Sequence, residues 1–203
     1  PGGARAIEDF SEILRPGTVV YVTFLPGSDF NATVETVSRL KREGFYPIPH
    51  FAARSIESEK ILEEGLERLK EEADTTEALL IGGGVDNPLG PFSASIEVLR
   101  TGLFDKYGFK KIGVAGHPEG SPDITPQECA QAIQEKNDFS CHTDADLYLA
   151  TQFLFEAEPL FKWEKAIRIQ GNKLPIHVGI PGLATIPTLM RHARQCGVGP
   201  SVR

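Results

Sequence analysis

Residues 147–156 read LYLATQFLFE, and this stretch decides the fold. Six of the ten residues are large apolar or aromatic side chains. A near-continuous apolar run of this length is typical of a strand that is covered on both faces, as in a parallel sheet. The run therefore predicts a buried strand over Leu147–Leu154, with the polar pair Thr151 and Gln152 in its second half.

Similar apolar runs recur on both sides of this strand, about one every 30 residues, the length of one βαβ step. The other predicted strands are Val19–Leu25, Phe45–Phe51, Ala78–Gly82, Lys111–Gly116 and Leu174–Ile180. Amphipathic stretches separate them and predict helices over Ile7–Leu14, Ala32–Glu43, Ile56–Glu72, Pro91–Phe104, Thr125–Asn137, Pro159–Ile169 and Thr185–Cys196. Ser55 and Thr125 have the chemistry of helix N-caps. The alternation predicts a parallel α/β fold, either a barrel or a doubly wound sheet.

Polar residues or glycines stand at the carboxyl end of nearly every predicted strand: Thr23, His50, Gly82–Gly84, His117, Gln152 and Gly179. In a (β/α)8 barrel these ends share one mouth, whereas a doubly wound sheet concentrates such residues at its switch point. The pattern favours the barrel. We expect residues 1–203 to be a single TIM-barrel-like domain, but six strands cannot close an eight-stranded barrel. The domain would lack about one unit at each end and have two open edges.

Composition excludes several classes of function. The net charge of −7 and pI of about 5.3 argue against non-specific binding to nucleic acid or to an anionic membrane surface. The three cysteines form no CxxC, which disfavours a disulfide framework or a zinc site and favours a reducing, cytoplasmic compartment. No apolar run reaches the ~18 residues of a membrane span. We expect no metal site.

Two candidate ligand contacts lie in the first half of the chain. The turn IGGGVDNP, residues 81–88, lets a ligand approach the backbone of Gly82, Gly83 and Gly84, although a plain glycine turn is an equal alternative. It matches neither GxGxxG nor a P-loop. His50, in PIPHF, could bind a ligand or satisfy a backbone carbonyl, and taken alone the second alternative is favoured.

Four candidates lie in the second half. His117, in AGHPEGSPD, has no accompanying Ser or Cys nucleophile motif, so a hydrolase is disfavoured. Lys136 is a lone lysine of the kind that usually lies on the surface, and only a suitable barrel mouth would bring it to a phosphate. A buried, unpartnered Gln152 would cost about 1–3 kcal/mol, so it needs a partner. Its position near the end of the strand favours a heteroaromatic ligand over loop backbone as that partner. The sequence IPG predicts a close-approach turn at Gly182, for which a structural βα loop is as likely an explanation as contact with a ligand.

Taken in order, these motifs resemble the flavin-dependent methylenetetrahydrofolate reductases. The resemblance runs from about Val19 to Cys196 and rests on VTF, PHF, the Gly-rich turn, AGHPEG, ATQFLFE and IPG. It implies a (β/α)8 barrel with FAD at the carboxyl mouth. NAD(P)H would reduce the flavin, which passes hydride to 5,10-methylenetetrahydrofolate to give 5-methyltetrahydrofolate. The family's FAD contacts would be Thr23, His50, Gly82, Gly83, Gly84, His117 and Lys136. Gln152 would contact the folate pterin, whose donor and acceptor edge fits an amide.

The sequence departs from the family at three places. The turn reads GGGVDNP where the family has Gly-Asp, so Asp86 is the candidate substitute for the catalytic acid. His117 stands where the family has Tyr. The family's catalytic glutamate is expected immediately upstream of Pro1. These departures keep two alternatives open: a folate-binding barrel without reductase activity, and oxidation of methyltetrahydrofolate in a demethylation pathway. The sequence also leaves open whether the protein forms a homo-oligomer.

Overall fold

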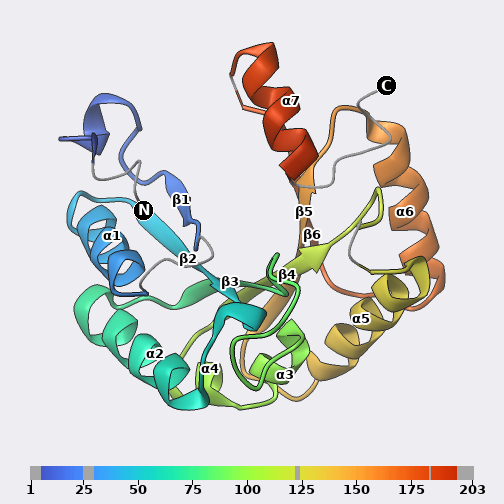
Figure 1. Ribbon diagram of the computed structural model, residues 1–203, viewed down its shortest axis with the longest axis horizontal. Helices are drawn as coiled ribbons and strands as arrows, with labels where there is room; N and C mark the ends of the chain where they lie inside the picture. The colour runs from blue at the N-terminus through green and yellow to red at the C-terminus, as the bar shows by residue number, and fades with distance from the viewer. Residues whose placement is uncertain (1–5, 25–29, 122–123, 183, 196–203) are drawn as a thin grey trace. The chain divides into compact units, whose positions relative to one another are not determined.

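The computed structural model describes residues 6–24, 30–121, 124–182 and 184–195, in which strands and helices alternate along the chain (Figure 1). The strands are β1 (Val19–Val22), β2 (Tyr46–Ala52), β3 (Glu77–Ile81), β4 (Lys111–Gly116), β5 (Asp146–Phe153) and β6 (Ile176–Gly179). The α-helices are α1 (Phe30–Arg42), α2 (Glu59–Ala73), α3 (Ser95–Leu99), α4 (Leu103–Lys106), α5 (Pro126–Phe139), α6 (Ala157–Ile169) and α7 (Ile186–Gln195). Two short 3-10 helices are η2 (Phe10–Glu12) and η3 (Ala53–Ser55).

The order of the strands decides between the two predicted folds. They are hydrogen-bonded in the order β1-β2-β3-β4-β5-β6, so each strand lies beside its neighbour in the chain. The pairs β1–β2, β2–β3 and β5–β6 are parallel. A doubly wound sheet would reverse its strand order at a switch point, and this order has no reversal. The fold is an incomplete (β/α)8 barrel, as predicted, and β1 and β6 end the order among the described strands.

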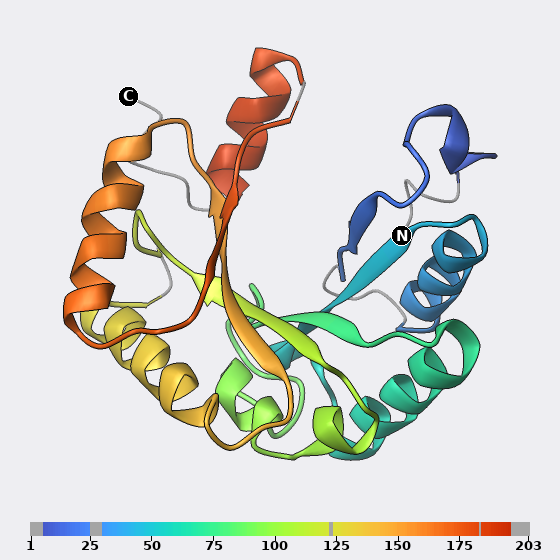
Figure 2. The same cartoon turned by 180° about the vertical axis from the view of Figure 1, so that it is seen from behind.

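The chain divides into two compact units, residues 1–113 with 143–146, and residues 114–142 with 147–203. In the first unit, α1 and α2 lie side by side next to β1 and β2 (Figures 1 and 2). Its core contains three phenyl rings in edge-to-face contact. Phe51 of β2 packs on Phe104 at 5.3 Å between ring centroids, and Phe104 packs on Phe109 at 5.1 Å. Such aromatic pairs hold β2 against the helices on one of its faces.

Helical periodicity predicted α1 and α2 well, but one cap was wrong. Val34, Val37 and Leu40 of α1 are at most 1% exposed, as expected for residues on a single helical stripe. The predicted N-cap of the second helix, Ser55, lies instead in η3. The helix begins at Glu59 because the Ser58 hydroxyl accepts a hydrogen bond from the Ile61 amide at 3.2 Å.

The single helix predicted over Pro91–Phe104 is also wrong, because two short helices, α3 and α4, replace it between Ser95 and Lys106. Gly102 stands between them with φ at 71°, in the left-handed region that favours glycine. The Thr101 hydroxyl donates to the carbonyl of Val98 at 2.7 Å and occupies one of the carbonyls freed where α3 ends.

In the second unit, α5 begins as predicted. Thr125 and Glu128 form a capping box, and Pro126 occupies the first turn.

Among the described residues, no helix is long and apolar enough to cross a membrane. β6 is shorter than the predicted Leu174–Ile180. Leu25 and Cys196, the ends of two other predicted elements, lie outside the described residues.

Candidate functional site

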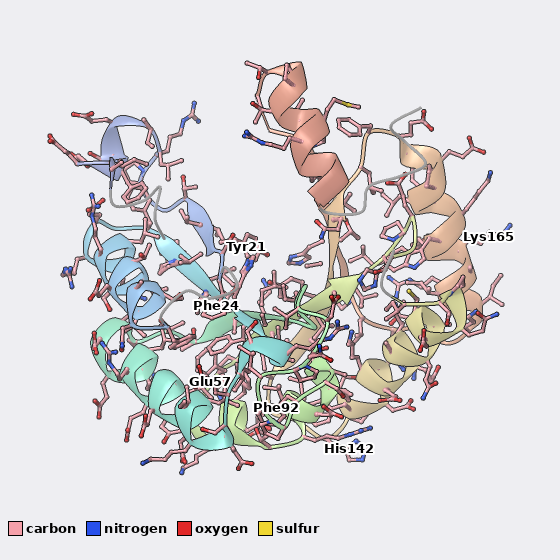
Figure 3. All side chains as sticks on the ribbon, viewed as in Figure 1. Tyr21, Phe24, Glu57, Phe92, His142 and Lys165 are labelled. Atoms are coloured by element: carbon pink, nitrogen blue, oxygen red, sulfur yellow. The ribbon has the colours of Figure 1, made fainter. Side chains whose placement is uncertain are left out.

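His50 lies on the face of β2 opposite to the phenyl ring of Phe51. Side chains alternate along a strand, and the register pairs Tyr21 of β1 with Ile48, two residues before His50. Tyr21 and His50 therefore share a face, and their rings meet edge to face with centroids 5.6 Å apart. Figure 3 shows Tyr21 at the end of β1. We call this the His50 face.

The imidazole of His50 has an unsatisfied nitrogen. Its Nε2 atom is buried and has no hydrogen-bond partner among the described residues. Burial lowers the pKa of His50 from 6.5 to about 4, because desolvation penalises the charged imidazolium. The ring is therefore neutral at pH 7 and can offer one donor and one acceptor. A buried polar atom of this kind indicates a site where another group completes the hydrogen bonding.

The Gly-rich turn after β3 lies against the end of β2. The Arg54 amide donates to the Gly82 carbonyl at 2.9 Å. Gly83 has φ at 93°, and a Cβ built on it would lie 3.1 Å from the Cβ of Ala52. Ala52 is two residues after His50 and shares its face. The structure therefore brings the turn and His50 together, at the carboxyl ends of adjacent strands.

Arg54 is a residue that sequence reasoning missed, and it fixes the rest of this loop. Its Nη1 donates to the Val85 carbonyl at 3.1 Å, and its Nε donates to the Ser93 carbonyl at 3.2 Å. Its own carbonyl accepts from the Leu89 amide at 2.8 Å. The available signal was an arginine three residues past the predicted strand end, with five donors in a fixed fork that suits backbone carbonyls.

The remaining predicted residues of the first unit are more open. Thr23 is exposed and follows Val22, whose strand partner is Pro49, so Thr23 leaves β1 beside the position of His50. Gly84 is exposed, and a Cβ built on it would meet nothing within 4 Å. Asp86 is also exposed, on the loop that Arg54 holds. The turn leaves room for a ligand, while the candidate acid lies in solvent.

In the second unit, the TQF motif forms a β-bulge. Leu149 and Ala150 pair with Ile176 and His177, but the next pair is Phe153 with Gly179, so Thr151 and Gln152 together face the single residue between. Gln152 is exposed, which corrects the expectation of a buried amide. A bulge redirects side chains, and bulges are common beside active sites.

The bulge is held by two residues from different strands. The Thr151 hydroxyl accepts a hydrogen bond from the Gly179 amide at 2.9 Å and donates to the Gln152 carbonyl at 2.7 Å. A Cβ built on Gly179 would lie 2.9 Å from backbone atoms of Thr151, Gln152 and Phe153. Gly179 is thus the close-approach glycine. A Cβ built on Gly182 would meet nothing within 4 Å, so close approach of a ligand there stays a prediction.

His117 and Lys136 occupy different environments in this unit. His117 is half-buried after β4, in a turn where its carbonyl accepts from the Gly120 amide at 3.1 Å. Lys136 in α5 is only 4% exposed, so its interpretation as a surface lysine was wrong. Burial lowers the pKa of Lys136 to about 8, which leaves the ammonium mostly charged at pH 7. Cys129 lies two helical turns earlier, and burial raises the pKa of its thiol.

Comparison with known proteins identifies the family. The methylenetetrahydrofolate reductase family model matches residues 92–200, more than half of the chain. The chain belongs to this family. Methylenetetrahydrofolate reductase 1 of Schizosaccharomyces pombe is 31% identical over 104 residues, which are 51% of this chain and 16% of that protein. The chain thus spans about a sixth of the length of this curated relative.

A structural neighbour supports the fold alone. A Burkholderia cenocepacia J2315 crystal structure assigned to the lyase/mutase class has a TM-score of 0.50 at 14% identity, over 90% of this chain and 76% of that one. Within the chain, the range matched to the methylenetetrahydrofolate reductase family contains His117, Lys136 and Gln152. His50 and the Gly-rich turn precede that range, so their interpretation depends on their geometry.

Proposed function

We propose that the protein is a flavin-dependent oxidoreductase of one-carbon metabolism. It would interconvert 5,10-methylenetetrahydrofolate and 5-methyltetrahydrofolate, with NAD(P)H as co-substrate. Membership of the methylenetetrahydrofolate reductase family supports a reductase role in folate metabolism. The observation that carries the flavin proposal is the buried, unpartnered Nε2 of His50 beside a glycine turn.

The residues of the first unit fit a flavin. An isoalloxazine ring has flat faces and an edge of hydrogen-bonding atoms, and a neutral imidazole can bond such an edge without adding charge. Gly83 and Gly84 carry no side chain that would exclude a ring system from the turn. Thr23, His50, Gly82, Gly83 and Gly84 would hold the cofactor in this unit. FAD, when bound, supplies the hydride chemistry, and the protein supplies binding, orientation and electrostatics.

Residues of the second unit would contribute a charged contact to the cofactor and an amide contact to the folate. Lys136 keeps a positive charge at pH 7 in a desolvated position, where it would attract an anion such as the cofactor's phosphates. His117 would be a further FAD contact. The exposed amide of Gln152 would pair with the donor and acceptor edge of the pterin, and the bulge would orient it. Asp86 is proposed as the acid of the reaction.

Reduction and reoxidation of bound flavin test the proposal. We expect the purified full-length protein to be yellow, to bleach with NADH or NADPH, and to recover its colour with methylenetetrahydrofolate. Gln152→Ala should weaken folate binding and leave the flavin spectrum unchanged. Gln131→Ala, on the exposed face of α5, is the matched control and should change neither. Equal folate affinity in the Gln152→Ala protein would remove the pterin role, and failure to bind or reduce flavin would remove the main proposal.

The second candidate is a folate-binding relative without reductase activity. The exposure of Asp86 favours it, because a catalytic acid is usually held in a defined, partly desolvated position. Colourless protein that binds methylenetetrahydrofolate would establish this alternative. An Asp86→Asn variant provides a further distinction, since it should lower turnover only if the carboxylate takes part in proton transfer.

A further inference from the structure

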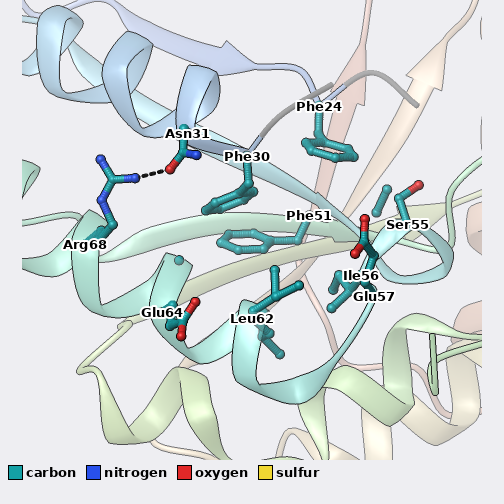
Figure 4. A pocket seen from close by; sticks show the side chains of 13 residues that line it. Phe24, Phe30, Asn31, Phe51, Ser55, Ile56, Glu57, Leu62, Glu64 and Arg68 are labelled. Atoms are coloured by element: carbon teal, nitrogen blue, oxygen red, sulfur yellow. Dashed lines mark hydrogen bonds between the residues drawn. The ribbon is translucent and has the colours of Figure 1, made fainter. Parts of the chain in front are cut away.

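The first unit contains a cavity of about 340 Å³ that the proposed function does not use. It opens between the first turn of α1, the first three turns of α2 and the end of β2 (Figure 4). The volume lies in the range of pockets that bind small molecules, about 300–1,000 Å³. Its residues include Phe24, Phe30, Phe51, Ser55 and Glu57.

This cavity is distinct from the site around His50. Phe51 and His50 are adjacent residues of β2, so their side chains point to opposite faces of the strand. Phe51 lines the cavity on the helix side, where it also packs on Phe104. His50 faces Tyr21 on the other side. A molecule among the phenyl rings would therefore lie on the other side of β2 from a molecule beside His50, although Ala52, at the end of the strand, lines the cavity and shares the face of His50.

Three phenyl rings form the apolar wall of the cavity. Phe30 lies between Phe24 and Phe51, with centroid distances of 6.2 and 5.3 Å and tilts of 42° and 38°. The ring of Phe30 lies directly on α2 at Gly65, since a Cβ there would come within 2.5 Å of it. Rings with these offsets and tilts can accept a further flat ring among them.

The cavity has polar groups at both ends, and the two ends differ in whether those groups are already paired. Figure 4 shows Ser55 and Glu57 on the side away from Arg68. The Ser55 hydroxyl is buried and has no hydrogen-bond partner among the described residues, although it lines the cavity. Glu57 is exposed at the same end. On the far side, the Nε of Arg68 lies 2.7 Å from the Oε1 of Glu72, so the positive charge of Arg68 is already paired.

We propose that this cavity binds a small planar aromatic molecule that carries a cationic nitrogen group. The aromatic ring would lie among Phe24, Phe30 and Phe51. The nitrogen group would donate to the Ser55 hydroxyl and face the Glu57 carboxylate. The phenyl faces also favour a cation through their quadrupoles. An anionic analogue of the same shape would meet the carboxylate and be rejected.

Benzamidine and benzoate form a matched pair of probes, because they share a ring and differ in charge. We expect benzamidine to bind the full chain, as measured by chemical-shift perturbation in NMR spectra, and benzoate to bind at least about tenfold more weakly. Ile61→Trp, at a residue that lines the cavity and is 41% exposed, should fill it and abolish benzamidine binding. Benzamidine that binds the wild type and the Ile61→Trp protein equally would place its site elsewhere and refute the proposal.

Two glutamate variants separate a specific contact from general charge. Glu57→Gln should weaken benzamidine binding by about two- to fivefold, the effect of one exposed charge pair. Glu59→Gln removes the same charge from an exposed residue outside the cavity lining and should have no effect. Equal losses in both variants, or equal affinities for benzamidine and benzoate, would overturn the proposed chemistry. Because the cavity lies on the other face of β2, Ile61→Trp should leave any flavin spectrum unchanged, which keeps this test independent of the proposed function.

Discussion

Acidification should destabilise the protein through His50, and the variant His50→Gln isolates this effect. The folded-state pKa of about 4 lies below the ordinary value of 6.5, so the unfolded chain binds the proton more tightly. Stability from this residue is therefore complete above pH 6.5 and falls as the pH decreases toward 4. At 1.36 kcal/mol per pKa unit, the full loss is about 3 kcal/mol, and about 2 kcal/mol of it is reached by pH 5.

Two measurements test this value. The chemical shift of the His50 ring proton, followed by NMR between pH 3.5 and 8, gives the folded-state pKa directly. Urea unfolding of the wild type and of His50→Gln at pH 7 and pH 5 gives the difference in free energy. Glutamine keeps polar groups at the position but does not titrate. Subtracting the pH dependence of the variant removes contributions from other groups, such as the lowered pKa values of Glu97 and Glu128.

The two outcomes differ clearly. We expect the wild type to lose about 2 kcal/mol more than His50→Gln between pH 7 and pH 5. If both proteins lose the same free energy, or if the NMR titration gives a pKa near 6.5, then the His50 imidazole is hydrated in the free protein. The proposal that a ligand atom completes the hydrogen bonding of Nε2 would then be refuted.

Three further predictions concern the backbone around the candidate sites. Gly179→Ala should reduce the free energy of unfolding by about 1–3 kcal/mol, because its Cβ would collide with the bulge, while Gly182→Ala should change it by less than about 0.5 kcal/mol. Thr125→Ala should cost about 1 kcal/mol in urea unfolding by removing the α5 cap, and Thr125→Ser should restore most of it. Arg54→Lys cannot reproduce the fork of donors to two carbonyls, so hydrogen exchange of the Leu89 amide should become faster. Unchanged exchange would mean that the loop is held by its backbone bonds alone.

The sequence predicted the architecture because hydrophobic periodicity reports burial directly. Lys111–Gly116 matches β4 residue for residue, and Thr125 caps α5 as expected. Errors arose where two local signals competed. Ser55 and Ser58 both precede the apolar stripe of α2, and only the second has its hydroxyl within reach of the third amide of the helix. Gly102 separates α3 from α4 within the helix predicted over Pro91–Phe104, because one left-handed residue redirects the chain.

Site residues were harder to place because their burial depends on partners far away in the sequence. Lys136 reads as a surface lysine in its own helix, but tertiary packing buries it. Gln152 reads as part of a buried run, but a bulge turns it outward. The fork of Arg54 joins the end of β2 to a loop some 30–40 residues later, a pairing that local composition does not encode. The chemistry of each side chain could be predicted from the sequence, whereas the direction in which the side chain points depends on the register of the strands.

The bulge also links two distant motifs of the family resemblance. TQF and the strand before IPG are separated in sequence, yet the Thr151 hydroxyl and the Gly179 amide share a hydrogen bond, and Gly179 must lack a Cβ for the strands to approach. Because strand side chains alternate with period two, one extra residue in β5 reverses the faces of everything after it. The direction of Gln152 thus depends on a hydroxyl one residue earlier and on a glycine in the next strand. Thr151→Val tests this dependence. It retains the shape of the side chain but removes the bond, and it should lower the folate affinity proposed for Gln152 without altering the amide itself; undiminished affinity would separate the bulge from binding.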